Sequence, residues 1–162
     1  MRNGEGSVSN SFKTQVRMTK QVETLEELIR ETFQDTENKP FVCFLGTLND
    51  WQIEVIQHLS GLDLTGYSHI ADSFFLRHVT SRHSDPLIEV SRGQAVVCSE
   101  DFLLLPDFFN HYDSMAYEIQ KGKHTLVFEK MVGRKRFVYV VELRIGKFKT
   151  VCALSLRVKS IK

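Results

Sequence analysis

The first part of the chain shows helical spacing of hydrophobic positions, followed by one short apolar run. Thr24 and Glu27 form a capping-box pattern in "TLEELIRETF", which predicts a helix over residues 24–34. The run "PFVCFLG", entered by Pro40 and closed by Gly46, is typical of a short buried strand. The sequence therefore predicts a helix and then a buried strand.

Two further helices are predicted from capping residues followed by apolar stripes. "NDWQIEVIQHL" has Asn49 or Asp50 as its cap, and Trp51 lies on its apolar stripe, so we expect Trp51 in the core. After the turn-like segment "SGLDLTGYSH", Asp72 or Ser73 caps the next helix. Both segments are therefore predicted to be helical.

From residue 114 the hydrophobic period changes from helical spacing to two. Four runs rich in β-branched and aromatic residues are separated by the turn-like segments "KGK", "VGRK" and "IGK". The runs are "MAYEIQ", "KHTLVFEKM", "RFVYVVELR" and "KTVCALSLRV". This pattern predicts an antiparallel meander of about four strands.

A two-residue turn at Gly133-Arg134 sets the register of the second and third of these strands. It pairs Thr125 with Glu142 and Glu129 with Val138, so these four residues share one face. With the next turn around Ile145-Gly146 or Gly146-Lys147, the same face gains Val151, Ala153, Ser155 and Arg157.

The opposite face of the meander is larger and more apolar, so we assign it to the helices. Its residues are Leu126, Phe128, Phe137, Tyr139, Val141, Leu143, Leu154 and Leu156, and Lys130 falls on the same side. The predicted fold class is α+β, with N-terminal helices packed on one face of a C-terminal antiparallel β-meander of about four strands. Residues 1–19 are polar and are expected to form a flexible tail before a single domain over residues 20–162.

Composition fits that single domain and a cytoplasmic setting. The 162 residues are 42% hydrophobic, which is typical of one globular core. The three cysteines, Cys43, Cys98 and Cys152, are widely spaced and lack a CxxC pattern, so neither a disulfide framework nor a zinc site is indicated. No apolar run approaches the roughly 20 residues that would cross a bilayer, so we expect no membrane partner.

The net charge of +1 conceals a strong asymmetry along the chain. Residues 121–162 hold 12 Lys and Arg against Glu129 and Glu142, while residues 1–120 hold 9 Lys and Arg against 18 Asp and Glu. The two parts therefore carry +10 and −9. This pattern indicates either self-neutralisation within the fold or a basic surface that binds a phosphate backbone.

The segment "FFLRHVTSRHSD" places His78 and His83 five residues apart, each after an arginine. The pair has three possible interpretations: a catalytic pair, half of a metal site, or a solvated helix end. A metal is disfavoured, because five-residue spacing does not stack two imidazoles on one helical face and no acidic cluster nearby completes the ligands. We therefore expect neither a bound metal nor a cofactor.

Five short motifs in order carry a resemblance to a known group of families. They are a "GLDLTGY" loop, a helix with two histidines, a helix ending in "LP", a basic hairpin ending in "VE", and a last strand with Ser or Thr near its end. The matching residues are Arg77, His78, His83, Leu105, Pro106, Val141, Glu142 and Ser155. From about Phe41 to Arg157 the chain resembles the phage- and prophage-associated nuclease families of the barnase, EndoU, colicin and RelE-like superfamily.

That resemblance implies a metal-independent endoribonuclease that uses the 2′-hydroxyl of its substrate. Such a reaction needs a base, an acid and cations around the phosphorane, and histidine serves as acid or base near neutral pH. We expect His78 and His83 to act as acid and base, with Glu142 as another candidate base and Ser155 in the site. The expected substrate-binding residues are Arg77, Arg82, Lys123, Lys130 and Arg157.

Each of these assignments has a structural alternative. Glu142 would then pair with a cross-strand Lys or Arg, and Ser155 and Arg157 would be ordinary residues of an exposed sheet face. The matching alternative for the whole chain is a catalytically inactive RNA-binding domain, or a phage structural domain, of the same fold. RNA is the expected partner, and an immunity, inhibitor or phage structural protein would also fit.

Overall fold

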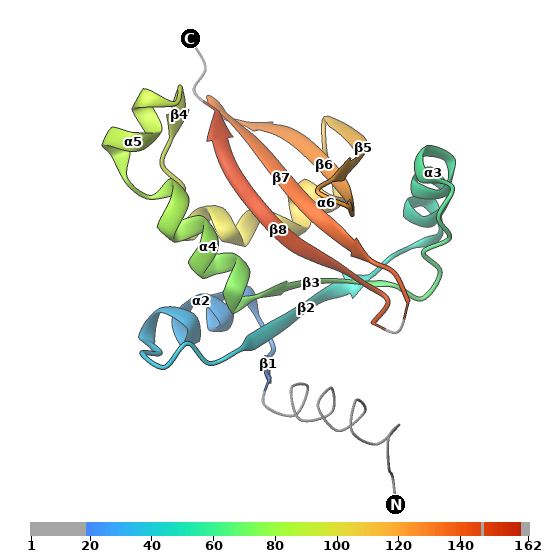
Figure 1. Cartoon of the computed structure of the whole chain (residues 1–162), viewed down its shortest axis with the longest axis horizontal. Helices are drawn as coiled ribbons and strands as arrows, with labels where there is room; N and C mark the ends of the chain where they lie inside the picture. Colours follow the sequence, from blue (N-terminus) through green and yellow to red (C-terminus); the bar gives the residue numbers. More distant parts are fainter. Residues whose placement is uncertain (1–18, 147, 160–162) are drawn as a thin grey trace, which may run out of the picture.

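The computed structural model describes residues 19–146 and 148–159 (Figure 1). The expected flexible tail, apart from Thr19, lies outside these residues. Three helices begin where capping residues predict them. Thr24 Oγ1 accepts from the Glu27 amide (3.1 Å) before α2 (Leu25–Gln34), Asn49 and Gln52 form a reciprocal capping box at α3 (Asp50–Ser60), and Asp72 caps α4 (Ser73–His83).

Strands from both ends of the chain form one sheet in the order β1-β2-β3-β8-β7-β6-β5, and β4 also pairs with β8. The C-terminal strands form the expected meander, and the strands β1, β2, β3 and β4 enlarge it. Their bounds are β1 (Lys20–Val22), β2 (Phe41–Thr47), β3 (Ser68–Asp72), β4 (Gln94–Ala95), β5 (Ser114–Gln120), β6 (Lys123–Val132), β7 (Lys135–Arg144) and β8 (Thr150–Lys159). The fold is therefore mixed α and β.

The sheet is larger than the predicted four-stranded meander. β3 runs parallel to β8, and β1 runs parallel to β2, so the sheet is not purely antiparallel. β1 and β4 have three and two residues, too few to show a period, and β3 lies in the segment "SGLDLTGYSH" that was expected to be a turn and in the residues after it. Pairing with long neighbours stabilises such short strands beyond their own sequence preference.

The helix expected to end at Pro106 divides into two. A 3₁₀ helix, η1, covers Ser99–Leu104, and α6 covers Leu105–Asn110 with Pro106 in its first turn. A proline is accommodated there because the first turn of a helix has no partner for its amide. Pro106 therefore starts a helix, and the prediction that it ends one was wrong. A further helix that was not predicted, α5 (Pro86–Ser91), follows α4 and starts with the capping residue Asp85 and with Pro86.

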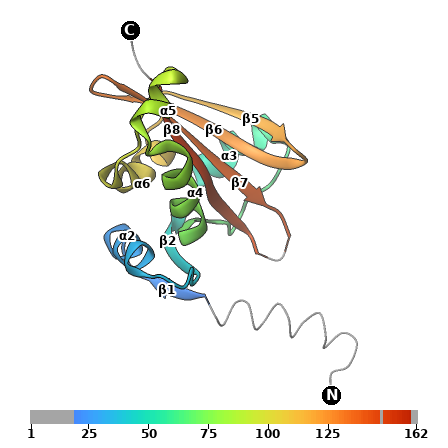
Figure 2. The same cartoon turned by 60° about the vertical axis from the view of Figure 1, so that its left-hand side comes forward.

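The large apolar face of β6 and β7 packs against helices, as predicted. The ring of Phe108 lies 4.8 Å from that of Phe137, and Phe109 lies 5.3 Å from Phe128, so α6 covers this face. Phe75 of α4 contacts Tyr139 at 6.2 Å. Figure 2 shows α2, α4 and α6 together on one side of β7 and β8, which leaves the other side of these strands for the charged residues.

The register confirms part of the expected face and corrects the rest. Thr125 pairs with Glu142 as predicted, but the β7–β8 loop is longer than two residues, because Arg144 pairs with Thr150. This moves two residues to the helix-covered face, namely Val151 and Ala153. A bulge then leaves Leu154 without a pairing partner on β7 and returns Ser155 and Arg157 to the face of Glu142.

Trp51 was expected in the core and is 57% exposed. α3 buries only Gln52 and Ile56, because it lies at the edge of the sheet beside β5 (Figure 1). The Trp51 ring stacks on Tyr112 at a centroid distance of 6.3 Å. Across the residues that the structure describes, no helix has the length and apolar character needed to span a membrane.

Candidate functional site

The face of β7 and β8 away from the helices carries charged and small side chains in consecutive rows. Side chains alternate along a strand, so every second residue of β7 lies on this face together with its partner on β8. The rows, in order, are Arg136 with Lys159, Val138 with Arg157, Val140 with Ser155, Glu142 with Cys152, and Arg144 with Thr150. We call this set the charged sheet face.

Glu142 lies near one end of the charged sheet face and is held by its neighbours. Its Oε1 is 3.4 Å from Nε of Arg144, and its side chain is 18% exposed. On the other side it faces Thr125, whose hydroxyl donates to the carbonyl of Glu118. The cation beside Glu142 therefore belongs to its own strand, two residues away, and not to a neighbouring strand as the structural alternative supposed.

Asp72 and Cys152 extend this group and were not expected from the sequence. Cys152 Sγ lies 3.8 Å from Asp72 Oδ2, because β3 runs beside the first half of β8. Burial, and then the nearby Asp72 carboxylate, raise the pKa of the Cys152 thiol to about 12. Since only a thiolate is a good nucleophile, Cys152 is a packing residue of this site. Its partner Asp72 also caps α4, and so joins the sheet to the histidine-bearing helix.

α4 starts where β3 ends and packs against β8. Its inner side buries Phe75, Leu76 and Val79, while His78 lies on the exposed side. Partial burial of the ring, and then the charges of Arg82 and His83, lower the pKa of His78, which favours its neutral imidazole. Phe74, one turn before His78, is 65% exposed.

His83 is the last residue of α4 and has a different environment from His78. Its Nδ1 lies 3.1 Å from Oε2 of Glu89, a fully buried carboxylate in α5. Arg92 approaches the other carboxylate oxygen, with Nη1 at 3.3 Å from Oε1. Sequence reasoning missed Glu89. Asp85 followed by Pro86 is a helix-start signal that indicates α5, but nothing in the sequence shows that α5 folds back onto the end of α4.

The four other expected substrate-binding residues lie in different places. Arg77 Nη2 donates to Asp35 (3.1 Å) and to the carbonyl of Lys39 (3.0 Å), so it ties α4 to the end of α2. Lys130 donates to the carbonyl of His111. Arg82 is exposed on α4, and Lys123 is exposed at the β5–β6 turn. Arg77 and Lys130 therefore make contacts away from the charged sheet face.

His69 lies on the opposite, helix-covered side of the sheet. Its ring stacks on Phe109 at 4.1 Å, and Nε2 lies 2.6 Å from the Tyr139 hydroxyl. Burial lowers the pKa of His69 to about 3, which keeps it neutral near pH 7. His69 is therefore a core residue, and it does not line the charged sheet face.

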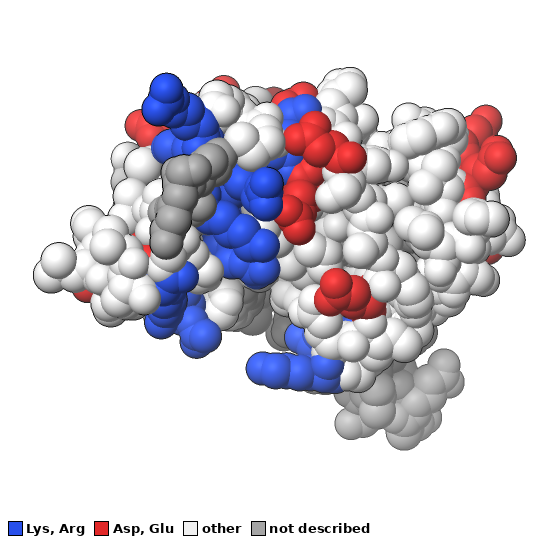
Figure 3. Space-filling view, turned by 90° about the horizontal axis from the view of Figure 1, so that it is seen from above, with Lys and Arg blue, Asp and Glu red and all other residues white. Residues whose placement is uncertain are grey.

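Basic residues gather at the end of the sheet where β8 finishes. Arg136 pairs with Lys159 there, and β4 pairs with the same end of β8. Figure 3, which looks at the molecule from that end, shows Lys and Arg side chains in a band with acidic groups beside it. Positive potential is thus concentrated on one part of the surface, in the form that attracts polyanions.

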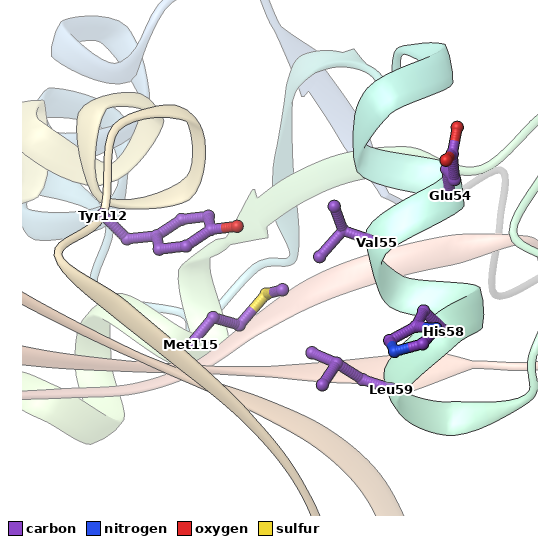
Figure 4. Close-up of a pocket in the computed structure, with 6 residues that line it drawn as sticks. All are labelled: Glu54, Val55, His58, Leu59, Tyr112 and Met115. Carbon is purple, nitrogen blue, oxygen red and sulfur yellow. The ribbon is translucent and has the colours of Figure 1, made fainter.

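The pocket drawn in Figure 4 is a separate feature between α3 and the start of β5. Its lining is mainly apolar, and Glu54 and His58 lie at its α3 side. The six lining residues are Glu54, Val55, His58, Leu59, Tyr112 and Met115. None of the expected catalytic residues lies in it.

In residues 19–146 and 148–159, no three His, Cys, Asp or Glu side chains converge in a way that could hold a metal ion. Comparison with known families gives one match. A family model described as phage-Barnase-EndoU-ColicinE5/D-RelE like nuclease 3 matches residues 47–161, a range that contains His78, His83, Glu142, Ser155 and Arg157. The searches of curated proteins and of solved structures found no match.

Proposed function

Because the chain belongs to the phage-Barnase-EndoU-ColicinE5/D-RelE like nuclease 3 family, we propose that it is a metal-independent endoribonuclease that cleaves RNA through the 2′-hydroxyl. One observation carries the proposal. Ser155, Arg157 and Glu142 occupy neighbouring rows of one sheet face, and the helix that carries His78 and His83 packs against the same strand, β8. Because the helices lie on the other side of β7 and β8 (Figure 2), the proposed reaction requires an RNA strand that reaches both the histidines and the phosphate-binding groups.

In the proposed reaction the substrate oxygen O2′ forms a bond to phosphorus while the bond from phosphorus to O5′ breaks. A base removes the proton of the 2′-hydroxyl, and an acid protonates O5′ as it leaves. His78 suits the base, because its lowered pKa favours the neutral imidazole, the form that accepts a proton. His83 takes the part of the acid. The products carry a 2′,3′-cyclic phosphate and a free 5′-hydroxyl.

Arg157 is the cation best placed to bind the reacting phosphate. A guanidinium donates two parallel hydrogen bonds to phosphate oxygens and stabilises the charge that develops on them. Arg136 and Lys159 extend the positive charge along the strand for further phosphates, and Ser155 adds a hydroxyl donor. The exposed ring of Phe74 offers a surface on which a neighbouring base stacks.

A second candidate is a catalytically inactive RNA-binding or phage structural domain of the same fold. The contact between Glu142 and Arg144 favours it, because an ion pair inside the site occupies a carboxylate that a base would need free. This candidate keeps the basic band and loses the chemistry.

The test uses purified full-length protein and three oligonucleotides of one sequence: RNA, DNA, and RNA with a single 2′-deoxy residue at the cleavage position. Each is incubated with and without excess EDTA, and products are identified by mass. We expect RNA to give 2′,3′-cyclic ends in EDTA, and the other two to stay intact at that position. DNA cleavage that EDTA abolishes would overturn the proposal, whereas salt-sensitive RNA binding without cleavage would support the second candidate.

A further inference from the structure

α5 has an inverted pattern of burial. Its apolar residues Leu87 and Val90 are 83% and 73% exposed, while the side chain that it buries completely is the carboxylate of Glu89. Burying a carboxylate costs free energy that its ion pairs only partly offset, and an apolar residue in that place is often as stable or more stable. Fold stability alone therefore does not account for a glutamate here.

The contacts of Glu89 point to His83. Its two oxygens have different partners: Oε1 faces Nη1 of Arg92, at 3.3 Å, and Oε2 faces Nδ1 of His83, at 3.1 Å. Arg92 supplies a countercharge to the Glu89 carboxylate at the oxygen that does not face His83. An ionised carboxylate only accepts hydrogen bonds, so Nδ1 of His83 must carry the hydrogen.

The backbone around His83 is also held in place. The amide of Val97 donates to the carbonyl of His83 at 2.8 Å, and Arg92 Nη1 donates to the carbonyl of Arg82 at 3.3 Å. The His83 side chain keeps 14% of its surface exposed. Since Nδ1 faces the buried carboxylate, we expect Nε2 to lie at the accessible edge of the ring.

We propose that Glu89 is a positioning residue for His83, and that it makes Nε2 of His83 the nitrogen that exchanges a proton with the substrate. The inference rests on the proposed ribonuclease function. Nδ1 donates to Glu89 whether the ring is neutral or charged, so proton transfer always takes place at Nε2. Carboxylates that hold a catalytic imidazole in one tautomer act in this way in other enzymes.

The Glu89→Gln variant tests the hydrogen bond with little change in shape. Arg92 only donates, so it selects the amide oxygen of the introduced side chain, and the NH₂ group then faces His83. An NH₂ group donates to Nδ1, which moves the imidazole hydrogen to Nε2. We expect kcat for RNA cleavage to fall roughly 10²-fold or more with KM little changed, because a wrong tautomer blocks proton transfer and leaves binding intact. Glu100→Gln, on the exposed surface of η1, is the matched control and should cleave like the wild type.

The second measurement is independent of cleavage. The ¹⁵N chemical shifts of the His83 ring, measured for the full-length protein at a pH where the ring is neutral, report its tautomer directly. We expect Nδ1–H in the wild type and Nε2–H in Glu89→Gln. A wild-type ring with the hydrogen on Nε2 would overturn the inference. This measurement needs only the wild-type protein, so it remains decisive if the variant fails to fold.

The two measurements separate the two proposals. Wild-type protein that does not cleave RNA but shows the Nδ1–H tautomer would contradict the ribonuclease function and leave the Glu89 contact supported. Wild-type protein that cleaves RNA, with Glu89→Gln equally active, would contradict the positioning role and leave the function standing. A variant that is less stable but retains kcat for each folded molecule would give Glu89 a structural role only, and would also overturn the inference.

Discussion

The carboxylate of Glu142 lies 3.4 Å from the guanidinium of Arg144, two residues further along the same strand. Residues two apart in a strand project from the same face, so this contact forms within the charged sheet face itself. It brings a carboxylate and a cation together beside Ser155 and Cys152. The ion pair either stabilises the fold or tunes a catalytic group, and substitution distinguishes the two.

We predict that Glu142→Gln lowers kcat for RNA cleavage roughly 10²-fold if Glu142, and not His78, is the general base, since that is the usual scale for losing such a base. Glu129→Gln is the matched control, because Glu129 lies on the same face opposite Val138. Initial rates at saturating RNA check the prediction. Equal activity of both variants would leave Glu142 with the ion pair alone.

His78 is expected to contribute to rate and little to stability. It lies on the exposed side of α4, away from the buried Phe75 and Val79, so His78→Ala should change the free energy of unfolding by about 0.5 kcal/mol or less. Its loss should lower kcat roughly 10²-fold or more. His111→Ala, which removes an exposed histidine paired with Asp107, is the control. Cleavage within a few-fold of wild type would place the base elsewhere.

Arg157 is predicted to contact phosphate through its charge. Each Lys or Arg that neutralises a phosphate adds about one unit to the slope of log binding constant against log salt concentration. Arg157→Gln should therefore reduce that slope by about 1, measured by fluorescence anisotropy with a non-cleavable RNA analogue. Arg30→Gln, on the exposed side of α2, should leave the slope unchanged. Equal slopes for wild type and Arg157→Gln would remove Arg157 from the RNA surface.

The sequence predicted most of the meander because local signals determine it. The two-residue turn before Lys135 leaves one register for β6 and β7, and Gly133 adopts the left-handed φ of 63° that this turn requires. The β7–β8 connection is longer, and a bulge follows it. Each departure moves the following residues of β8 to the opposite face, so the second reverses the effect of the first: Ser155 and Arg157 reached their predicted face while Val151 and Ala153 did not.

The rest of the candidate site depends on contacts between distant segments, which have no local signal. Asp72 meets Cys152 because β3, a five-residue strand, aligns beside β8. Glu89 meets His83 because α5 folds back on α4. Trp51 shows the opposite problem: its helix has an apolar stripe, but the sheet edge covers only part of that stripe. Periodicity shows that a face is apolar without showing how much of it will be covered.

Stability should fall as the pH drops below neutrality, because His69 is buried in a neutral state. Its pKa is about 3 in the folded protein and 6.5 in its ordinary environment, so the unfolded chain binds a proton first. The stability that depends on a neutral His69 is fully present above pH 6.5 and is lost as the pH falls from 6.5 toward 3. Once His69 is protonated in the unfolded chain, its effect lowers the free energy of unfolding by about 1.4 kcal/mol for each further pH unit. Urea unfolding at intervals from pH 7 to pH 5 measures it.

The control for this acid sensitivity is a pair of histidine substitutions. His69→Gln keeps a polar partner for Tyr139 without titrating, so the variant should lack this part of the slope, while His58→Gln, on the exposed side of α3, should retain it. Asp35 and Asp63 do not obscure the comparison. A hydrogen bond from the backbone of Lys39 lowers the pKa of Asp35, and one from the Thr65 hydroxyl lowers that of Asp63, so both titrate below the measured range. Equal slopes for the wild type and His69→Gln would show that His69 does not control the acid sensitivity of the fold.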